Sequence, residues 1–178
     1  MKSKLLGLLV LILFGIVSRL LPHPPNFTPI LAIGIFTGYA YPKWIGPVVL
    51  LTSMLLSDLY LGIGILTPVV YGSLLICNMI GWRVRGIKTM ALGSFFGACV
   101  FYIVTNFAVW CMGGYGYSWA GLIECYTMAI PFFQNTLFSC LLYGGILYAL
   151  YNWKPDWYYI RSMTNANTYN WRGSGQLG

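Results

Sequence analysis

The segment 19–29, RLLPHPPNFTP, contains the side chains of this chain best suited to hold a solute. It includes the only histidine, His23, together with Arg19, Asn26 and four prolines. Proline fixes φ near −65° and also restricts the residue before it, so the segment is predicted to be a stiff, extended loop with few backbone donors. Such a loop is suited to cover the mouth of a cavity, where its unpaired carbonyls would serve water or a ligand.

Six more side chains are candidates for the same pocket because of the chemistry they offer. They are Asp58, Asn106, Trp110, Glu124, Tyr126 and Asn135. The carboxylates would fix polar or cationic groups, the amides would supply hydrogen bonds, and the aromatic rings would stack on a flat or cationic ligand. Asn106 and Trp110 are four residues apart and therefore share a helix face. Arg19 and His23 would order the proline-rich loop.

The elements that position these residues are expected to lie in lipid. Of the 178 residues, 58% are hydrophobic and 7% are charged, whereas a soluble domain carries about 25% charged residues. A soluble fold of this length needs a charged shell, which ten basic and three acidic residues do not supply. The aromatic content of 17% fits belts of Trp and Tyr at the membrane interfaces.

We therefore predict an all-α membrane protein with a bundle of about six transmembrane helices. A helix needs about 20 residues to cross the hydrocarbon core. The six candidate spans are residues 5–21, 30–41, 45–61, 65–82, 90–111 and 130–152. The second is short and rich in small residues, which predicts a tilted, broken or shielded helix. Residues 1–153 would form the transmembrane domain, and residues 154–178 a polar cytoplasmic tail.

Basic residues alternate with these spans along the chain. Lys and Arg precede the first span, occupy the second and fourth connections, and follow the sixth, whereas the intervening connections carry Asp58 and Glu124. By the positive-inside rule, both termini are cytoplasmic and the two carboxylates face outward. The net charge of +7 is thus an orientation signal and an attraction to anionic lipid, and it does not indicate nucleic-acid binding.

On this topology the nine candidate residues gather in the outward half of the bundle, while Asn78 lies toward the inner end. Ionisable groups at membrane depth cost about 2.5–3.5 kcal/mol each, so they normally face the bundle interior and pair or bind something. A polar cavity open to the outside satisfies this requirement. With Arg19, Asp58 and Glu124 as its charges, the cavity would favour a neutral, zwitterionic or cationic solute.

Each candidate also has a purely structural interpretation. Arg19 and Asp58 would form a buried ion pair between the first and third spans. His23 would be a hydrogen-bonded loop residue, since no Cys or second His has metal-ligand spacing with it. Asn26 would cap the second span or, within Asn-Phe-Thr, accept a glycan. Asn135 would only bridge helices. Glu124 would be a solvated charge, and most of the aromatic residues would be interfacial.

Small residues and cysteines leave further alternatives open. Two pairs have the small-x-x-x-small spacing of closely packed helices, either inside the bundle or against another subunit: Gly34 with Gly38, and Gly93 with Gly97. Cys111 and Cys125 flank one outward loop and are either free or joined in a disulfide. Residues 1–18 also resemble a secretory signal peptide, but no small-x-small cleavage site closes the apolar run.

Enzymatic activity is not predicted. The sequence contains no GxSxG, HExxH or P-loop motif and no second histidine to ligate a haem. No metal or cofactor is expected, and without a Walker motif the chain would not hydrolyse ATP by itself.

Four segments in order resemble a group of small, uncharacterised bacterial membrane proteins regarded as candidate transporters. They are RLLPHPPNFTPILAIGIF, LLSDLYLG, TNFAVW and ECYTMAIPFFQNTLF. That group is similar in size and span number to the S components of energy-coupling-factor vitamin transporters. The resemblance implies a vitamin-like solute bound in the outer half, and a partner made of a transmembrane coupling subunit and two ATPases. The Ala-x-x-x-Ala docking pattern of S components does not occur on the first span.

The sequence thus predicts a multi-pass protein of the bacterial inner membrane that captures a small polar or aromatic solute from outside. The alternative from another class is a structural or assembly subunit of a larger membrane complex, with no solute bound. A third hypothesis is a self-sufficient carrier that works as a dimer.

Overall fold

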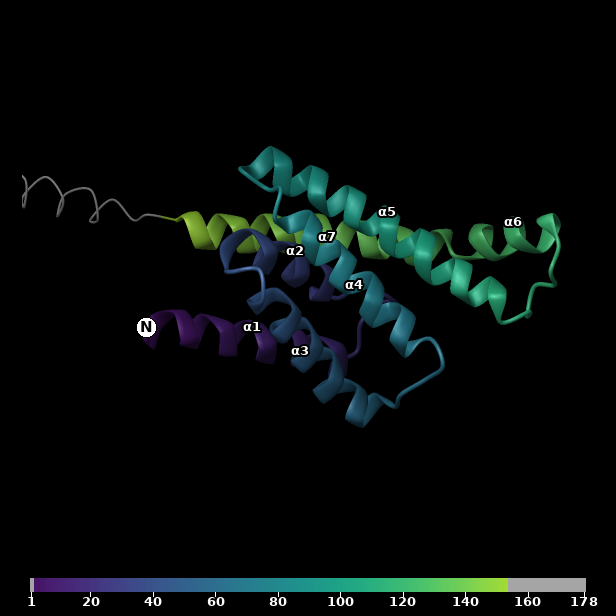
Figure 1. Cartoon of the computed structure of the whole chain (residues 1–178), viewed down its shortest axis with the longest axis horizontal. Coiled ribbons are helices and arrows are strands. Elements are labelled where there is room, and N and C mark those ends of the chain that lie inside the picture. The colour runs from purple at the N-terminus through teal and green to yellow at the C-terminus, as the bar shows by residue number, and fades with distance from the viewer. Residues whose placement is uncertain (1, 154–178) are drawn as a thin grey trace, which may run out of the picture. The chain divides into compact units, whose positions relative to one another are not determined.

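The computed structural model describes residues 2–153, with side chains from residue 5 onward. Within this range the chain forms seven α-helices and no strand: α1 (Lys2–Leu20), α2 (Ile30–Ala40), α3 (Ile45–Leu61), α4 (Thr67–Gly81), α5 (Ile87–Cys111), α6 (Trp119–Met128) and α7 (Ile130–Asn152) (Figure 1). The described residues up to Tyr148 form one compact unit. The predicted tail, residues 154–178, and its basic residues lie outside the described part.

Six of the helices coincide with the six predicted apolar segments, which confirms the all-helical class. The third and sixth segments have the predicted bounds, and the other four differ from them by one to three residues at either end. The connection before the sixth segment was predicted to be a loop, but it contains α6. Ser118 caps this helix, because its side chain accepts a hydrogen bond from the Gly121 backbone N–H at 3.1 Å.

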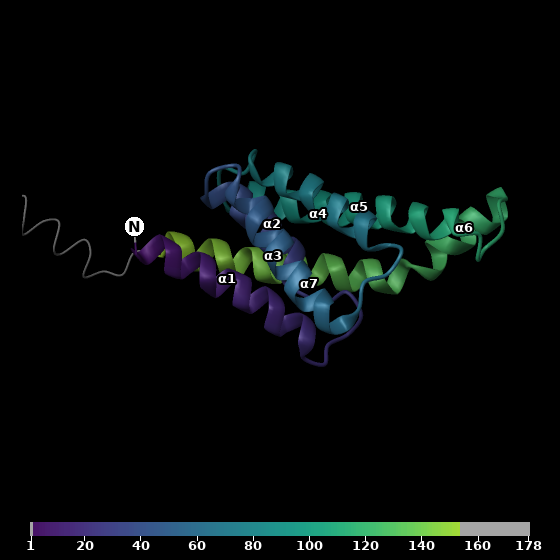
Figure 2. The ribbon, with the colours of Figure 1, turned by 60° about the horizontal axis from the view of Figure 1, so that its bottom comes forward.

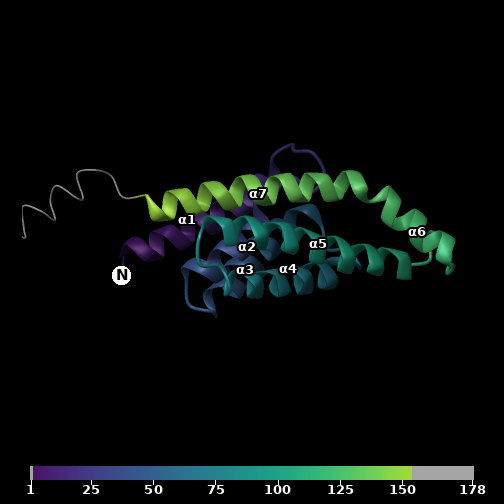
Figure 3. The ribbon, with the colours of Figure 1, turned by 90° about the horizontal axis from the view of Figure 1, so that it is seen from above.

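Helix α2 forms the core of the bundle. Nine of its 11 residues, Ile30 to Gly38, are buried. Its sequence is apolar on every side, as expected for a helix enclosed by other helices. It packs against α1, α3, α4 and α5, and Figure 3 shows it between α7 on one side and α3 and α4 on the other. The short second segment is therefore shielded by its neighbours.

Glycines set the closest approach in this core. Gly38 on α2 faces Gly81 on α4, where a Cβ on either residue would lie about 3 Å from the Cα of the other. The side chain of Ile35 on α2 packs against Gly93 and Gly97 on α5, where an added Cβ would lie 3.5 Å and 2.7 Å from it. Both small-x-x-x-small pairs therefore face the bundle interior, as one of the two interpretations predicts.

Helix α7 contacts the other helices through large side chains. The Tyr143 ring lies 5.7 Å from Phe14 and 6.1 Å from Phe27, and the Phe133 ring lies 4.9 Å from Tyr102, centroid to centroid. Figure 2 shows α7 running alongside α1. Because these aromatic rings hold α7 away from the other helices, there is room for cavities between α7 and the core helices.

The connections that carry Lys or Arg lie at one end of this unit, and the connections without them lie at the other. Lys43, between α2 and α3, places its Nζ 4.7 Å from the ring centroid of Trp82, beside the basic α4–α5 connection. The loop between α1 and α2 and the connection between α3 and α4 lie at the other end, as the alternation of the helices requires. Helix α6 lies beyond that second end (Figures 1 and 3).

Two helices, α5 and α7, are long and apolar enough to cross a membrane by length and composition. The other four apolar segments of the described part, 5–20, 30–40, 45–61 and 67–81, are shorter, with between 10 and 17 residues each. Membrane association is supported to this extent, and the six-span arrangement stays a prediction.

Candidate solute-binding site

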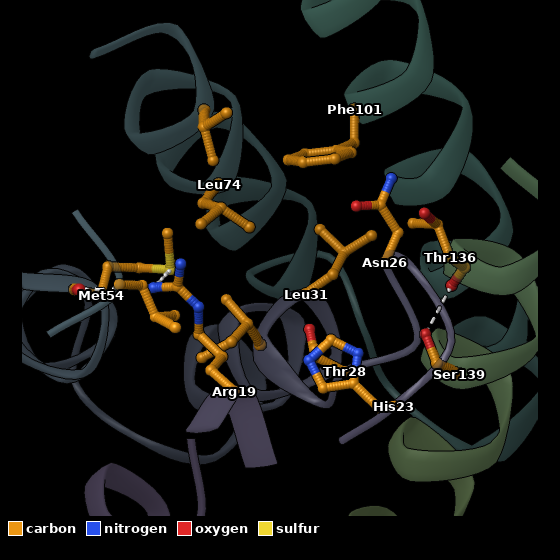
Figure 4. Close-up of a pocket in the computed structure, with 13 residues that line it drawn as sticks. Arg19, His23, Asn26, Thr28, Leu31, Met54, Leu74, Phe101, Thr136 and Ser139 are labelled. Atoms are coloured by element: carbon orange, nitrogen blue, oxygen red, sulfur yellow. Dashed lines mark hydrogen bonds between the residues drawn. The ribbon is translucent and has the colours of Figure 1, made fainter. Parts of the chain in front are cut away.

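A cavity of about 210 Å³ lies where the loop between α1 and α2 meets four other helices. Its walls are mixed, with polar side chains from the loop and α7 and aliphatic or aromatic ones from α2 to α5 (Figure 4). The lining residues central to its chemistry are Arg19, His23, Asn26, Thr28, Phe101 and Ser139. His23 and Asn26 are exposed whereas Ser139 is buried, so the cavity runs from the surface into the bundle.

The proline-rich loop is built on a tight turn. The Phe27 N–H donates to the Pro24 carbonyl at 2.9 Å, and Asn26 has a φ of 63°. Proline at the second position, Pro25, and a positive φ at the third are the features of a type II turn, in which Asn is one of the few residues that tolerate the third position. The loop is therefore turned and not extended as predicted, because this hydrogen bond folds it back.

Asn135 fixes this turn to α7. Its Nδ2 donates to the Pro25 carbonyl at 3.0 Å, across 110 residues of sequence. The bridging role considered for Asn135 is the one observed, with a loop and not a helix as the partner. A carbonyl left unpaired by the proline-rich sequence thus receives a side-chain donor.

Arg19 and Asp58 form the ion pair that was one of the two predicted alternatives. The Nη2 of Arg19 lies 2.5 Å from Asp58 Oδ1, and its Nη1 donates to Ser57 Oγ at 2.6 Å. Tyr71 donates its hydroxyl to the other carboxylate oxygen at 2.8 Å. The Asp58 side chain is only 6% exposed, so its negative charge is balanced by Arg19 and its oxygens are hydrogen-bonded to these partners.

His23 takes part in a local hydrogen bond. Its Nδ1 lies 2.8 Å from the Pro24 carbonyl, and because a carbonyl only accepts, Nδ1 carries the proton. In the neutral ring, Nε2 is then left as an acceptor. Among the described residues no group of three or more His, Cys, Asp or Glu side chains has the arrangement of a metal site.

These pairings change the predicted charge of the site. Arg19 is neutralised by Asp58, and Glu124 is exposed on α6 without lining the cavity. With His23 neutral, the first cavity carries no net charge. A neutral solute fits these walls better than a cation or an anion.

A second cavity of about 180 Å³ adjoins the first. The two share four lining residues, Asn26, Val70, Phe101 and Thr136. The second is richer in aromatic side chains, with Tyr102, Phe132 and Phe133 added to Phe101. Asn106 also lines it, and donates its Nδ2 to the Tyr102 carbonyl at 2.8 Å.

The structure brings together four of the nine predicted site residues in the linings of these cavities. Arg19, His23 and Asn26 line the first, and Asn26 and Asn106 line the second. The other five lie outside both linings: Asp58, Trp110, Glu124, Tyr126 and Asn135. Asp58 and Asn135 support the site indirectly, through Arg19 and Pro25.

Three of these five residues belong to the region around α6. Trp110 donates its Nε1 to the Gly116 carbonyl at 3.0 Å, and Tyr126 donates its hydroxyl to the Ile103 carbonyl at 2.7 Å. Glu124 is exposed. The unpredicted helix α6 directs Tyr126 toward α5 and leaves Glu124 at the surface, whereas Trp110 lies on α5 itself and bonds to the α5–α6 connection.

Cys111 and Cys125 are free in the structure. The Cys125 thiol is buried, which raises its pKa and keeps it protonated. It is placed to donate to the Asn106 carbonyl at 3.5 Å. Cys111 is exposed at the end of α5.

Several lining residues were missed by the sequence analysis because each is ordinary by itself. They are Thr28, Phe101, Tyr102, Thr105, Thr136 and Ser139. The spacing of Thr136 and Ser139, three residues apart on an apolar helix, was an available signal of a polar stripe. Tyr102 and Asn106 repeat that signal at a spacing of four on α5.

The fold and cavities define a class: an all-helical chain with membrane-spanning candidates and an internal polar cavity. The chain belongs to a family of unknown function (DUF6580), whose model matches residues 1–161. This agrees with the predicted resemblance to an uncharacterised family. No curated protein and no solved structure matches the chain significantly, so the resemblance to S components stays a prediction.

Proposed function

We propose that this chain is a multi-pass membrane protein that binds a small uncharged solute in the first cavity. The observation that carries the proposal is a cavity of about 210 Å³ whose one strong cation is already paired, and whose loop residues His23 and Asn26 reach the surface. Polar groups in an apolar bundle are expensive in lipid unless they pair with one another, bind a ligand or contact water.

The exposed apolar surface supports the membrane part of the proposal. Side chains on the outer faces of the helices are mainly large and apolar, including Leu9 and Leu13 on α1, Leu55 on α3, and Phe96 on α5. A soluble monomer rarely exposes a continuous apolar surface of this kind. Six membrane crossings, with both termini cytoplasmic and the cavity in the outer half, follow from the charges of the connections.

Orientation is testable with single cysteines in a cysteine-free background. Cysteine at Ile63, in the α3–α4 connection, is expected to react with a membrane-impermeant maleimide from outside the cell. Cysteine at Lys88, beside the basic α4–α5 connection, is expected to react only after permeabilisation. Reaction of both positions from one side would contradict the topology.

Solute binding is testable by extraction and mass spectrometry of the purified protein. Thr28→Trp would fill the cavity with a bulky ring, since Thr28 lines it. Tyr60→Trp is the matched control, because Tyr60 is 82% exposed and lies outside the cavity. We expect a small molecule in extracts of the wild type and the control, and its loss from Thr28→Trp. Identical extracts from all three would reject the proposal.

The source of energy is a further part of the hypothesis. Coupling to a transmembrane subunit and ATPases would follow from the S-component resemblance alone. Uptake into vesicles from this chain alone would instead favour a self-sufficient carrier. A structural subunit of a larger complex would copurify with fixed partners and without solute.

A further inference from the structure

The ring of Phe101 lies at the boundary of the two cavities and lines both. It is half-buried, and it makes no ring contact with another aromatic side chain in the described part of the chain. The neighbouring Tyr102, by contrast, makes an edge-to-face contact with Tyr126 and a tilted contact with Phe133. Phe101 therefore offers an unoccupied aromatic surface to whatever fills the cavities.

Asn26 lies beside this ring (Figure 4), and its side-chain amide has no hydrogen-bond partner within residues 5–153. The backbone that carries it is held by the turn from Pro24 to Phe27 and by Asn135. A carboxamide offers two N–H donors and an acceptor oxygen. The amide is thus presented to both cavities from a fixed loop.

The remaining polar wall is richer in acceptors than in donors. The hydroxyls of Thr105, Thr136 and Ser139 donate to carbonyls of their own helices, at 2.7, 2.9 and 3.0 Å. Their oxygens keep lone pairs for a ligand. The Nδ2 of Asn106 likewise donates within its helix, to the Tyr102 carbonyl, so its Oδ1 remains available as an acceptor in the lining of the second cavity.

Arg19, the cation of the first cavity, does not change this excess of acceptors over donors. Arg19 directs its donors at Asp58, Ser57 and the Met54 carbonyl and sulfur. An anionic ligand would therefore meet acceptors and a neutralised guanidinium. A ligand that brings its own N–H or O–H groups would meet partners.

Building on the solute-binding function proposed above, we propose that the ligand is a flat, uncharged molecule rich in hydrogen-bond donors, such as an aminated heterocycle or an aromatic amide. Its ring stacks on Phe101 across the two cavities. Its polar edge bonds to the amide of Asn26 and to the acceptors of α5 and α7. The shared lining of the two cavities allows one molecule to occupy both.

Four matched probes test this assignment: 2-naphthamide, methyl 2-naphthoate, 2-naphthoate and decahydro-2-naphthamide. The second lacks the N–H donors, the third carries a negative charge and the fourth lacks the flat ring. Binding is measured by equilibrium dialysis of the purified full-length chain with mass-spectrometric quantification. The signal from Thr28→Trp is subtracted, which removes partition into detergent.

We expect 2-naphthamide to bind about tenfold more tightly than each of the other three, the effect of one or two hydrogen bonds or of a lost stacking contact. Asn26→Gly is expected to reduce this affinity without unfolding the loop, since glycine accepts the positive φ. Phe101→Leu is expected to abolish the preference over the saturated analogue. Phe96→Leu is its matched control, because Phe96 is on the same helix and 55% exposed.

The outcomes separate this inference from the proposed function. Equal affinity for the amide and the ester, or for the flat and the saturated amide, would overturn the ligand class while solute capture stands. Equal signals from the wild type and Thr28→Trp for every probe, together with no extracted solute, would overturn both.

Discussion

Two asparagines, Asn78 and Asn26, show how differently the two ends of the helical unit are built. Asn78 is 1% exposed, and its Nδ2 donates to the Gly34 carbonyl at 2.7 Å. Its amide lies so close to Gly46 that any larger residue there would overlap it. Asn26 is exposed beside two cavities, with an amide that has no partner among the described side chains and backbone groups.

The difference is one of packing, not of residue type. At the Asn78 end, glycines bring α2, α3 and α4 together until a carboxamide fills the remaining space. At the Asn26 end, a proline-rich loop and the large rings of α7 hold the elements apart. An amide is a structural crosslink in the first place and a binding group in the second. Four predictions sharpen or break this contrast.

The largest effect is expected for Gly81→Ala at the Asn78 end. A Cβ there would overlap the Ile35 carbonyl oxygen and lie 3.0 Å from Gly38 Cα. Because backbone atoms do not move aside easily, we expect a loss of about 3 kcal/mol in the free energy of unfolding. Gly72→Ala, on the same helix with no atom within 4 Å of its Cβ position, is the control. Thermal unfolding in detergent measures both, and equal midpoints would contradict close packing at Gly81.

Arg19→Ala is expected to cost a similar amount, about 3 kcal/mol, because it leaves the buried Asp58 carboxylate without its cation. The double variant Arg19→Ala/Asp58→Ala removes both charges. It is expected to be more stable than the sum of the two single losses predicts, by about 1–2 kcal/mol. Strictly additive losses in chemical denaturation would show that the ion pair does not stabilise the Asn26 end.

The two asparagines themselves give the third comparison. Asn78→Ala removes a buried hydrogen bond and leaves a gap among glycines, so we expect a loss of about 2 kcal/mol. Asn26→Gly removes only an exposed amide and keeps the positive φ, so its effect on stability is expected to stay within about 0.5 kcal/mol. Similar unfolding midpoints for both variants would erase the proposed distinction between the two ends.

Asn135→Ala is expected to destabilise the chain less than Asn78→Ala. It removes one partly exposed hydrogen bond to the Pro25 carbonyl, so we expect about 1 kcal/mol of destabilisation. Because the loop then moves more freely, solute affinity is expected to fall severalfold. Gln134→Ala, at the exposed neighbouring position, is the control. Unchanged solute affinity in Asn135→Ala, measured by equilibrium dialysis, would show that the loop is held by other contacts.

Sequence reasoning succeeded where the physical signal is local. Hydropathy and length located six helices, because a continuous apolar run is visible without knowing its neighbours. The glycine spacing located the close-packing faces of α2 and α5, since residues four apart share a face whatever the fold, and the structure shows that these faces pack inside the bundle. A cavity lies at the α1–α2 loop, beside the polar end of the first helix.

Sequence reasoning failed where several partners compete for one side chain. Asp58 and Glu124 were assigned to the same pocket, but Arg19 and Tyr71 take up the first, and α6 turns the second to the surface. The ten-residue helix α6 is short and lies between two much longer apolar helices. Short segments of this kind are fixed by the elements around them and not by their own sequence.

The sequence alone determined the helical class, the positions of six of the seven described helices and the charge alternation, because each depends on residues within a few positions of one another. The tertiary structure decided that α2 is the enclosed helix, that Arg19 is neutralised, and that Asn26 faces two cavities. Those outcomes depend on contacts across 39 residues, as between Arg19 and Asp58, or 110 residues, as between Pro25 and Asn135. No local pattern specifies which distant group arrives, so the character of the site is a property of the folded chain.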